Sequence, residues 1–256
     1  MNIINNIGKK TLGYIRSFGV VSIFFYKTVV NTITPRWYFS LIGQQFYKIG
    51  FLSLPVVGMT AVFTGAVLAL QTFIGASRYA VADTVPSIVV LAITRELGPV
   101  LTGLMVAGRI SSAIAAELGT MTVTEQIDAL KTLSTNPFKY LIAPRIIAAT
   151  ISLPILTLLS DIIGVFGGYL VSVYSLDFNG SSYITKTLHY LEVQDVTSGL
   201  IKSIVFGFLI AFMGSFYGYN SGNGAEGVGK ATTNAVVVSS IMILLSNYLM
   251  AEIFFA

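Results

Sequence analysis

Five long apolar stretches constrain the fold of this 256-residue chain more than any other feature. A helix needs about 20 residues to cross about 30 Å of hydrocarbon, and each stretch is near or above that length. In chain order they are residues 50–74, 85–108, 146–174, 196–217 and 235–255. Because only short polar connections separate them, the sequence predicts an all-α integral membrane protein with about five transmembrane helices.

Composition agrees with that class. Charged residues make up only 10% of the chain, whereas a soluble domain carries about 25%. There is no cysteine, which excludes disulfides and thiolate metal sites, and the single His189 has no obvious metal partner. No tandem repeat or long linker divides the chain, so we expect one membrane domain over residues 1–256, with the transmembrane bundle at residues 50–255. We expect no metal site and no catalytic residue.

The first 37 residues are basic and aromatic rather than uniformly apolar. Lys27 interrupts the apolar run, no small-residue cleavage site follows, and Pro35 closes the segment. This pattern differs from a signal peptide and favours a basic amphipathic helix in the membrane interface over residues 1–37. A sixth span is the alternative, although the apolar run between Arg16 and Lys27 has only half the required length.

The distribution of lysine and arginine predicts the orientation. With the N-terminus in the cytoplasm, most basic residues fall on the cytoplasmic side: Lys9, Lys10, Arg16, Lys27, Arg36, Arg109, Lys131, Lys139, Arg145 and Lys230. The opposite side then receives only Arg78 and Lys186. By the positive-inside rule, the 111–145 connection is cytoplasmic, and the 177–195 loop and the C-terminus lie outside.

The stretch GAEGVGKATT, residues 224–233, resembles a phosphate-binding loop of the form G-x-x-x-x-G-K-[ST]. Ala231 occupies the position of the Mg²⁺-binding hydroxyl, and membrane spans rather than a strand and a helix flank the glycines. We interpret the match as a coincidence in a Gly-rich turn. This chain is therefore expected to bind no cofactor, and any ATP and Mg²⁺ would be bound by a separate subunit.

The 111–145 connection is too long for a turn and contains TVTEQIDALKTL. Thr122 or Thr124 can cap a helix with Glu125 in its first turn, and apolar residues follow at helical spacing. The sequence thus predicts a short helix that is apolar on one side. Such a helix could insert into a groove of a cytosolic partner, or it could be a plain surface or re-entrant helix, and periodicity alone does not separate these alternatives.

A longer run identifies a family. The sequence TRELGPVLTGLMVAGRISSAIAAELGTMTVTEQIDALKTLSTNP, followed by YLIAPRIIA, closely resembles the MlaE/YrbE permeases, and GVGKATTNAVV matches their last connection and span. The resemblance covers essentially the whole chain. It implies a permease subunit of an ATP-binding cassette (ABC) transporter that moves phospholipid between the inner and outer membranes of Gram-negative bacteria. An inner-membrane location follows, and a plastid membrane is the less favoured alternative.

The resemblance also implies partners. Members of this family form a homodimer that pairs with two copies of a cytosolic ATPase, with a ring of MCE-domain lipid-binding proteins outside and often a STAS-domain protein inside. Membrane lipid is the implied ligand, and nucleic acid is not. By the same resemblance, residues 118–135 form the cytoplasmic coupling segment. Its ATPase-docking residues would be Glu125, Gln126, Ile127, Asp128, Ala129 and Leu130.

Charged residues inside the predicted spans are the main site candidates. Arg95 and Glu96 lie in the second span, Asp161 near the middle of the third and Lys202 in the fourth, and each costs a few kcal/mol unless paired or hydrated. Adjacent helical residues point about 100° apart, so Arg95 and Glu96 should reach different partners, Lys202 among them. These charges could form an architectural ion-pair network or lie beneath a lipid cavity. The family resemblance implies that the matching charged positions take part in the function of related permeases, and this favours a place beneath a lipid cavity.

Leu97 and Met105 could line an acyl-chain cavity beside those charges. The full set of substrate-path candidates is Arg95, Glu96, Leu97, Met105, Asp161, Lys202 and Lys230. Close helix packing is expected at Gly164 and Gly168, and at Ala107, Ser111 and Ala115.

Two other functions remain open from the residues alone. An ion- or proton-coupled secondary transporter could use Glu96, Asp161 and Lys202, but it would show inverted repeats and broken helices. A membrane scaffold without transport is the second alternative.

Overall fold

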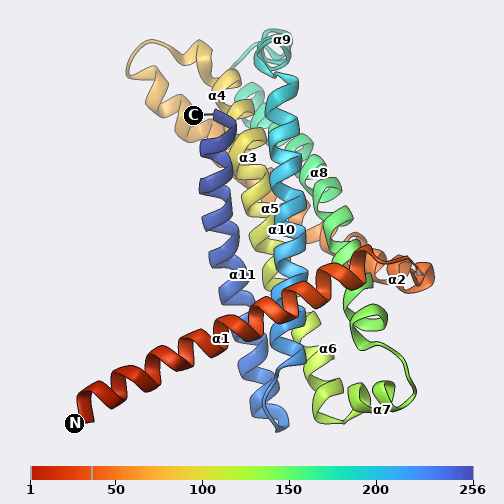
Figure 1. Ribbon diagram of the computed structural model, residues 1–256. Coiled ribbons are helices and arrows are strands. Elements are labelled where there is room, and N and C mark those ends of the chain that lie inside the picture. Colours follow the sequence, from red (N-terminus) through yellow and green to blue (C-terminus); the bar gives the residue numbers. More distant parts are fainter. Residues whose placement is uncertain (1, 36, 256) are drawn as a thin grey trace.

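The structure is a computed structural model that describes residues 2–35 and 37–255, except for the side chains of residues 2–11 and 14. All of its regular elements are helices within those residues, and five helical segments are long and apolar enough to cross a membrane. The predicted all-α membrane fold is confirmed (Figure 1). Arg36 and the side chains of Lys9 and Lys10, which entered the charge count, lie outside the described residues.

The spanning segments are bundled side by side and are each built from one or more helices. The first, Phe39–Ser77, contains α2 (Phe39–Ile49), η1 (Phe51–Ser53) and α3 (Leu54–Ser77). The second, Ala82–Val123, contains η2 (Ala82–Thr84), α4 (Val85–Ala92), η3 (Ile93–Leu97), α5 (Gly98–Val106), η4 (Ala107–Ser111) and α6 (Ser112–Val123). The third, Phe138–Ser175, contains η5 (Phe138–Ile142) and α8 (Ala143–Ser175); α10 (Val193–Tyr219) and α11 (Gly224–Phe255) are the fourth and fifth.

These spans match the expected number and order but extend beyond the predicted limits. The second continues to Val123 instead of ending near residue 108, and the fifth begins at Gly224 instead of 235. Their ends carry polar residues such as Glu117 and Glu226, which end an apolar run but do not end a helix. Intrahelical hydrogen bonds continue after the hydrophobic pattern stops, so hydropathy alone underestimates helix length.

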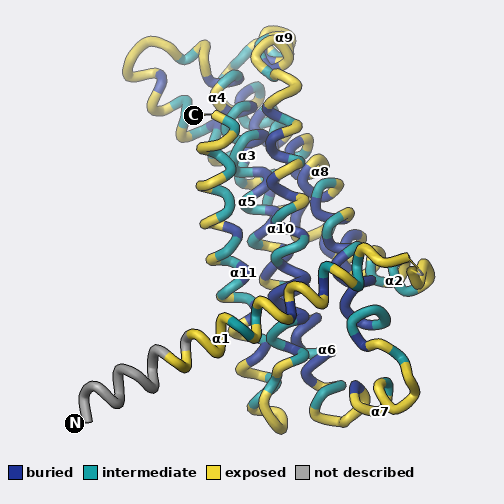
Figure 2. The backbone as a smooth tube through the Cα atoms, in the orientation of Figure 1, coloured by how far each residue is buried: buried dark blue, intermediate teal, exposed yellow. Residues whose placement is uncertain are grey.

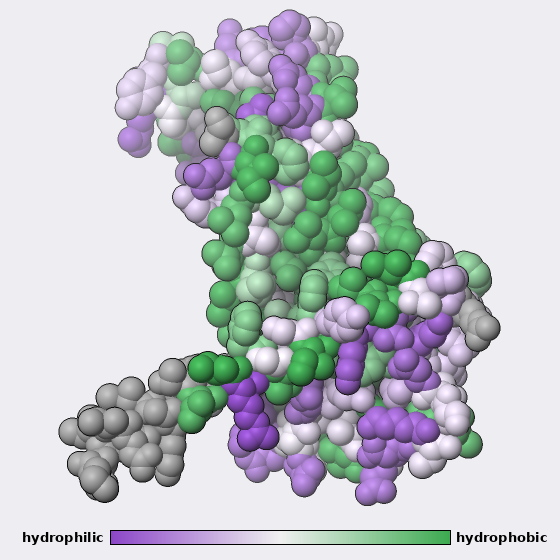
Figure 3. Space-filling view, in the orientation of Figure 1, coloured by the Kyte–Doolittle hydropathy of each residue, from purple (hydrophilic) through white to green (hydrophobic). Residues whose placement is uncertain are grey.

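Two connecting helices mark opposite ends of the bundle. The short helix α7 (Gln126–Thr132) lies at one end and α9 (Gly180–Tyr190) at the other (Figure 1). The 177–195 segment was expected only as a loop, so α9 is an addition; Asn179 caps it by accepting a hydrogen bond from the Ser182 amide at 3.1 Å. A space-filling view shows an apolar belt around the middle of the bundle with polar groups towards both ends (Figure 3).

The N-terminal helix α1 (Asn2–Ile33) crosses the bundle obliquely near the α7 end (Figure 1). It is not among the five membrane-spanning candidates found in the described residues, so the alternative of a sixth span is not supported. Phe24 anchors it, because this buried ring contacts Phe138, Phe212 and Phe216 with centroids 5.1–5.7 Å apart. Phe18, by contrast, is 75% exposed. One part of the helix thus packs on the bundle while apolar side chains remain available to lipid.

The bundle core follows α8, which lies against both α3 and α10, and its buried residues form a continuous interior (Figure 2). The expected close contact at Gly164 is confirmed: a Cβ on Gly65 of α3 would overlap the Gly164 carbonyl. Ala107, Ser111 and Ala115 are fully buried. A Cβ on Gly218 would lie 2.9 Å from the Ala115 carbonyl, so α6 and α10 also meet through small residues.

The Gly-rich stretch 224–233 is not a turn, which corrects that part of the expectation. It forms the first turns of α11, and only Gly224 keeps a left-handed backbone, at φ +73°. A phosphate-binding loop offers free backbone N–H groups to the anion, whereas beyond the first turn of a helix those groups bond to carbonyls. The resemblance to a phosphate-binding loop is therefore one of sequence only.

Candidate functional site

Arg95 and Glu96 lie in a π-helical turn, η3, that interrupts the second span. Such turns carry one extra residue per turn and occur frequently at functional sites. Pro99 follows directly and has no N–H to donate, which favours an irregular hydrogen-bond pattern in the preceding turn. The local sequence thus explains why the helix is interrupted at these two charged residues.

Glu96 is held by donors from two other spans. Its Oε1 accepts a hydrogen bond from Lys202 Nζ at 2.7 Å, and its Oε2 accepts one from Asn247 Nδ2 at 2.9 Å. Lys202 is fully buried and also donates to the Arg95 backbone carbonyl at 3.0 Å. The glutamate side chain is 39% exposed. The two hydrogen bonds to Glu96 therefore join α10 and α11 to η3, while part of the glutamate side chain stays accessible.

Arg95 reaches a different partner, as its position beside Glu96 suggested. Its Nε donates to Asp195 Oδ1 at 2.6 Å, and Asp195 Oδ2 accepts the Glu192 amide at 3.0 Å. The guanidinium also lies 4.6 Å from the Phe255 ring centroid, within the range of a cation–π contact. Asp195 is completely buried, so its charge is neutralised within the protein. Together, Arg95, Glu96, Asp195, Lys202 and Asn247 form what we call the charge cluster.

Asp161 does not belong to the charge cluster, so the ion-pair network left open by the sequence does not include all four of the predicted intramembrane charges. The second acid is Asp195 instead. Asp161 is 5% exposed, and neither of its carboxylate oxygens accepts a hydrogen bond from a residue that the structure describes. Its Oδ1 packs directly against Gly98, where a Cβ would overlap it. Asp161 thus faces a different environment from the other intramembrane charges.

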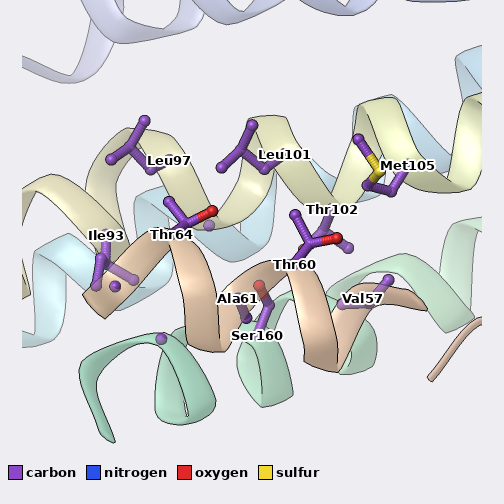
Figure 4. Close-up of a pocket in the computed structure, with 13 residues that line it drawn as sticks. Val57, Thr60, Ala61, Thr64, Ile93, Leu97, Leu101, Thr102, Met105 and Ser160 are labelled. Atoms are coloured by element: carbon purple, nitrogen blue, oxygen red, sulfur yellow. The ribbon is translucent and has the colours of Figure 1, made fainter. Parts of the chain in front are cut away.

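Leu97 and Met105 line a narrow groove between α5 and α3 together with Leu101 (Figure 4). Thr60 and Thr64 of α3 contribute hydroxyl groups to the opposite wall. Towards the α9 end, the groove adjoins a wider hollow of about 430 Å³ that shares Thr64 and Leu97. The groove itself has a free volume of only about 10 Å³, so the room for an apolar chain is in the adjoining hollow, and the groove continues its mainly apolar lining along the two helices.

Lys230 is far from this region. It forms an ion pair with Glu226 of its own helix at 2.7 Å, and both side chains are more than 70% exposed. Lys230 and Asn247 lie 17 positions apart on α11, which corresponds to about 25 Å along a helix axis. The structure therefore separates Lys230 from the other substrate-path candidates.

The expected short helix exists as α7, but it begins differently. Neither Thr122 nor Thr124 caps it, because their hydroxyls donate to Leu118 and Thr120 carbonyls within α6. Glu125 is not in the first turn: it precedes α7 in a left-handed conformation, with φ +58°. That residue turns the chain sharply between α6 and α7.

The α7 side chains divide as an amphipathic helix requires. Ile127 is buried against the bundle, and Leu130 is partly buried. Glu125, Gln126, Asp128 and Ala129 are exposed. Asp128 pairs with Lys131 at 2.7 Å, and this hydrogen bond raises the pKa of the Lys131 ammonium. Leu133, which continues the i, i+3 spacing of Ile127 and Leu130 in the sequence, lies beyond the helix end and is 73% exposed.

A second ion-pair network supports the base of α7. Glu117 near the end of α6 accepts hydrogen bonds from Lys48 at 2.9 Å and from Arg145 at 2.6 Å. Arg109 donates to Ser53 Oγ at 2.7 Å. These contacts tie α2, α6 and α8 together where the chain enters and leaves the α7 segment.

Sequence reasoning missed Asp195, Asn247 and Glu117. Asp195 was placed at the end of the outer 177–195 loop because the predicted fourth span begins at residue 196, although the E-x-x-D spacing from Glu192 is a helix-start signal. Asn247 and Glu117 carry no local signal, because their partners lie 151 and 28 residues away along the chain. Within the described residues, no group of three or more His, Cys, Asp or Glu could hold a metal ion.

Comparisons with known proteins define the family. The family described as "Permease MlaE" matches residues 42–253. A "Probable ABC transporter permease protein" of Rickettsia felis is 58% identical over 255 residues, covering 100% of this chain and 98% of the relative. The "Intermembrane phospholipid transport system permease protein MlaE" of Haemophilus influenzae is 31% identical over 256 residues, covering 100% and 98%.

A plant protein is also similar. "Protein TRIGALACTOSYLDIACYLGLYCEROL 1, chloroplastic" of Arabidopsis thaliana is 39% identical over 215 residues, covering 83% of this chain and 61% of the relative. The bacterial relatives match along nearly their whole length, and the family match includes all five spans from α2 to α11. The chain therefore belongs to the MlaE family of ABC transporter permeases.

Proposed function

We propose that this chain is the permease through which an ABC transporter moves phospholipid between the inner and outer membranes of a Gram-negative bacterium. The observation that carries the proposal is the geometry of η3. Leu97 faces the apolar groove, while the two preceding residues belong to the charge cluster. A phospholipid needs apolar walls for its chains and polar groups for its headgroup, and this turn supplies both next to each other.

In this proposal the α7 end is cytoplasmic and the chain is an inner-membrane protein with a cytoplasmic N-terminus. Two copies of the permease pair with two copies of a cytosolic ATPase that binds the ATP and Mg²⁺. An MCE-domain protein would receive or deliver lipid at the α9 end, and a STAS-domain protein could join at the α7 end. Purified alone, the chain should show no change in melting temperature with Mg-ATP.

Lipid transfer tests the groove. The complex is reconstituted in donor vesicles, and transfer of labelled phospholipid to acceptor vesicles is measured for Leu101→Trp, which fills the groove, and for Ile155→Trp. Ile155 is 46% exposed on α8 and does not line the groove, so it is a matched control. We expect Leu101→Trp to reduce transfer strongly and Ile155→Trp to leave it near wild type. Equal transfer by both variants would contradict a lipid path between α3 and α5.

Charge reversal tests the role of α7. Glu125 and Asp128 are exposed, so replacing both by Lys should leave the fold intact but weaken ATPase association by about tenfold, or about 1.4 kcal/mol. Glu226→Lys, an exposed reversal at the same end, is the control. Co-purified ATPase and lipid-stimulated hydrolysis are the measurements. Unchanged association in the α7 variant would exclude α7 as the coupling helix without affecting the test of the groove.

A further inference from the structure

A separate cavity of about 470 Å³ lies in the half of the bundle nearer α9. Leu158, Ile162 and Phe166 of α8 form one side, and α9 forms another. These three side chains are 41–60% exposed, so the cavity opens towards the lipid-facing surface. Its volume falls within the range of about 300–1,000 Å³ that is typical of small-molecule sites.

The cavity contains one carboxylate and no opposing basic residue. Among the described residues that line the cavity, Asp161 is the only acid, and none is a lysine, arginine or histidine. Asp161 is 5% exposed, and its two oxygens, which have almost no accessible surface, lack a hydrogen-bond donor among the described residues. Thr187 of α9 also lines the cavity, and its buried hydroxyl has no hydrogen-bond partner among the described residues. Buried polar groups are rarely left unsatisfied, so this arrangement calls for a ligand or ordered water.

Aromatic rings extend from the carboxylate towards α9. Phe166, Tyr169 and Tyr183 all line the cavity; the first two rings stack with centroids 6.4 Å apart, and Tyr169 meets Tyr183 edge-on at 5.7 Å. Aromatic faces attract cations, and a carboxylate forms its strongest hydrogen bonds with charged donors. The carboxylate and the aromatic faces therefore favour a positive ligand, whereas the aliphatic walls of the cavity favour an apolar one.

The α3–α5 groove and the α9-side cavity have different chemistry although adjacent residues line them. Ser160 lines the α3–α5 groove and Asp161 lines the α9-side cavity; Ile93 and Thr94 divide in the same way. The groove has threonine hydroxyls but no carboxylate in its lining. A ligand selected by charge would thus distinguish the α9-side cavity from the lipid groove.

We propose that the α9-side cavity binds a hydrophobic organic amine, whose ammonium group pairs with the Asp161 carboxylate once this side chain rotates from its place against Gly98 towards the cavity, and whose apolar part packs on Phe166, Tyr169 and Ile184. The ammonium supplies the missing donors, and the pairing neutralises both charges in an apolar environment. A phospholipid acyl chain could fill the volume but would leave the carboxylate without a partner. This site does not depend on the proposed phospholipid path.

Binding of dansylcadaverine, a fluorescent primary amine, tests the proposal, with its N-acetyl derivative as the uncharged matched probe. Both are titrated into the full chain in nanodiscs, and the signal from empty nanodiscs is subtracted. Asp161→Asn keeps the side-chain shape but removes the charge; Glu226→Gln removes an exposed acid elsewhere. We expect Asp161→Asn to raise the Kd of the amine by about tenfold or more, with no change for the acetylated probe or for Glu226→Gln.

A second variant tests the site even if Asp161→Asn fails to fold. Ile184→Trp leaves the carboxylate in place but narrows the cavity from α9, so it should weaken both probes. Equal affinity of wild type for the two probes would show that the cavity selects apolar chains rather than cations and would overturn the proposal. Amine binding that survives both Asp161→Asn and Ile184→Trp would also overturn it, because the amine would then bind elsewhere.

Discussion

Glu96 and Asp161 are both carboxylates inside the spanning bundle, yet their surroundings are opposite. Glu96 accepts hydrogen bonds from Lys202 and Asn247, and its side chain is 39% exposed. Asp161 is 5% exposed and has no donor among the described residues. The more exposed acid is thus the better satisfied one. The exposed fraction of a carboxylate therefore does not indicate whether it holds the bundle together or is available to a ligand. The hydrogen-bond donors around the carboxylate indicate this instead.

Removing the cation beside Glu96 should have the largest effect on stability. Lys202→Met preserves the apolar stem but leaves Glu96 with Asn247 as its only side-chain donor among the described residues and removes the ammonium that donates to the Arg95 carbonyl. Breaking a buried pair costs about 3–5 kcal/mol, and partial exposure of Glu96 places the expected loss at about 3 kcal/mol. Thermal denaturation monitored by size-exclusion chromatography measures it. Lys230→Met, which breaks an exposed pair, is the control and should change stability by less than about 0.5 kcal/mol.

Crowding Asp161 should have the next largest effect. A Cβ on Gly98 would overlap Asp161 Oδ1, so Gly98→Ala is expected to cost about 2 kcal/mol through overpacking. The same substitution made together with Asp161→Ala should cost less. Removing the Asp161 carboxylate should restore only part of the stability lost in Gly98→Ala, because the new methyl would still lie 2.9 Å from the Ile93 carbonyl. Equal losses in both backgrounds, measured by the same thermal assay, would show that Asp161 does not occupy this space.

Neutralising Glu96 in the Lys202→Met background should return part of the lost stability, about 1 kcal/mol. Glu96→Gln removes the uncompensated charge while keeping an acceptor for Asn247, so the two substitutions should not be additive. Phospholipid transfer separates architecture from mechanism in this double variant. We expect stability to recover and transfer to remain lost. Full recovery of transfer would show that the charge cluster serves packing alone.

Asp161→Asn should have the smallest effect on stability, within about 0.5 kcal/mol. The substitution is nearly isosteric and breaks no ion pair or hydrogen bond among the described residues. Thermal denaturation without added amine tests this directly. A loss of stability as large as that of Lys202→Met would contradict the contrast between Glu96 and Asp161, because Asp161 would then support the fold as Glu96 does.

The membrane class, the number of spans and the family could all be predicted from the sequence. The separation of Arg95 and Glu96 onto different partners also followed from their adjacency, because neighbouring helical residues point in different directions. The partner of Arg95 could not be found this way. Asp195 lies 100 residues from Arg95 along the chain and carries no intramembrane signal, since it stands at the first turn of α10.

Apolar length is a local property, because crossing hydrocarbon depends only on consecutive residues; the sequence by itself therefore determined that this chain is a five-span helical membrane protein. The presence of a short helix in the 111–145 connection and close helix contact at Gly164 and Ala115 also followed from local sequence patterns. Tertiary structure alone decided that Glu96 is paired while Asp161 faces an apolar cavity. That outcome depends on how helices that are distant in sequence are rotated and shifted along their axes relative to one another. Moving α8 would change the residues that contact Asp161, and moving α10 would separate Lys202 from Glu96.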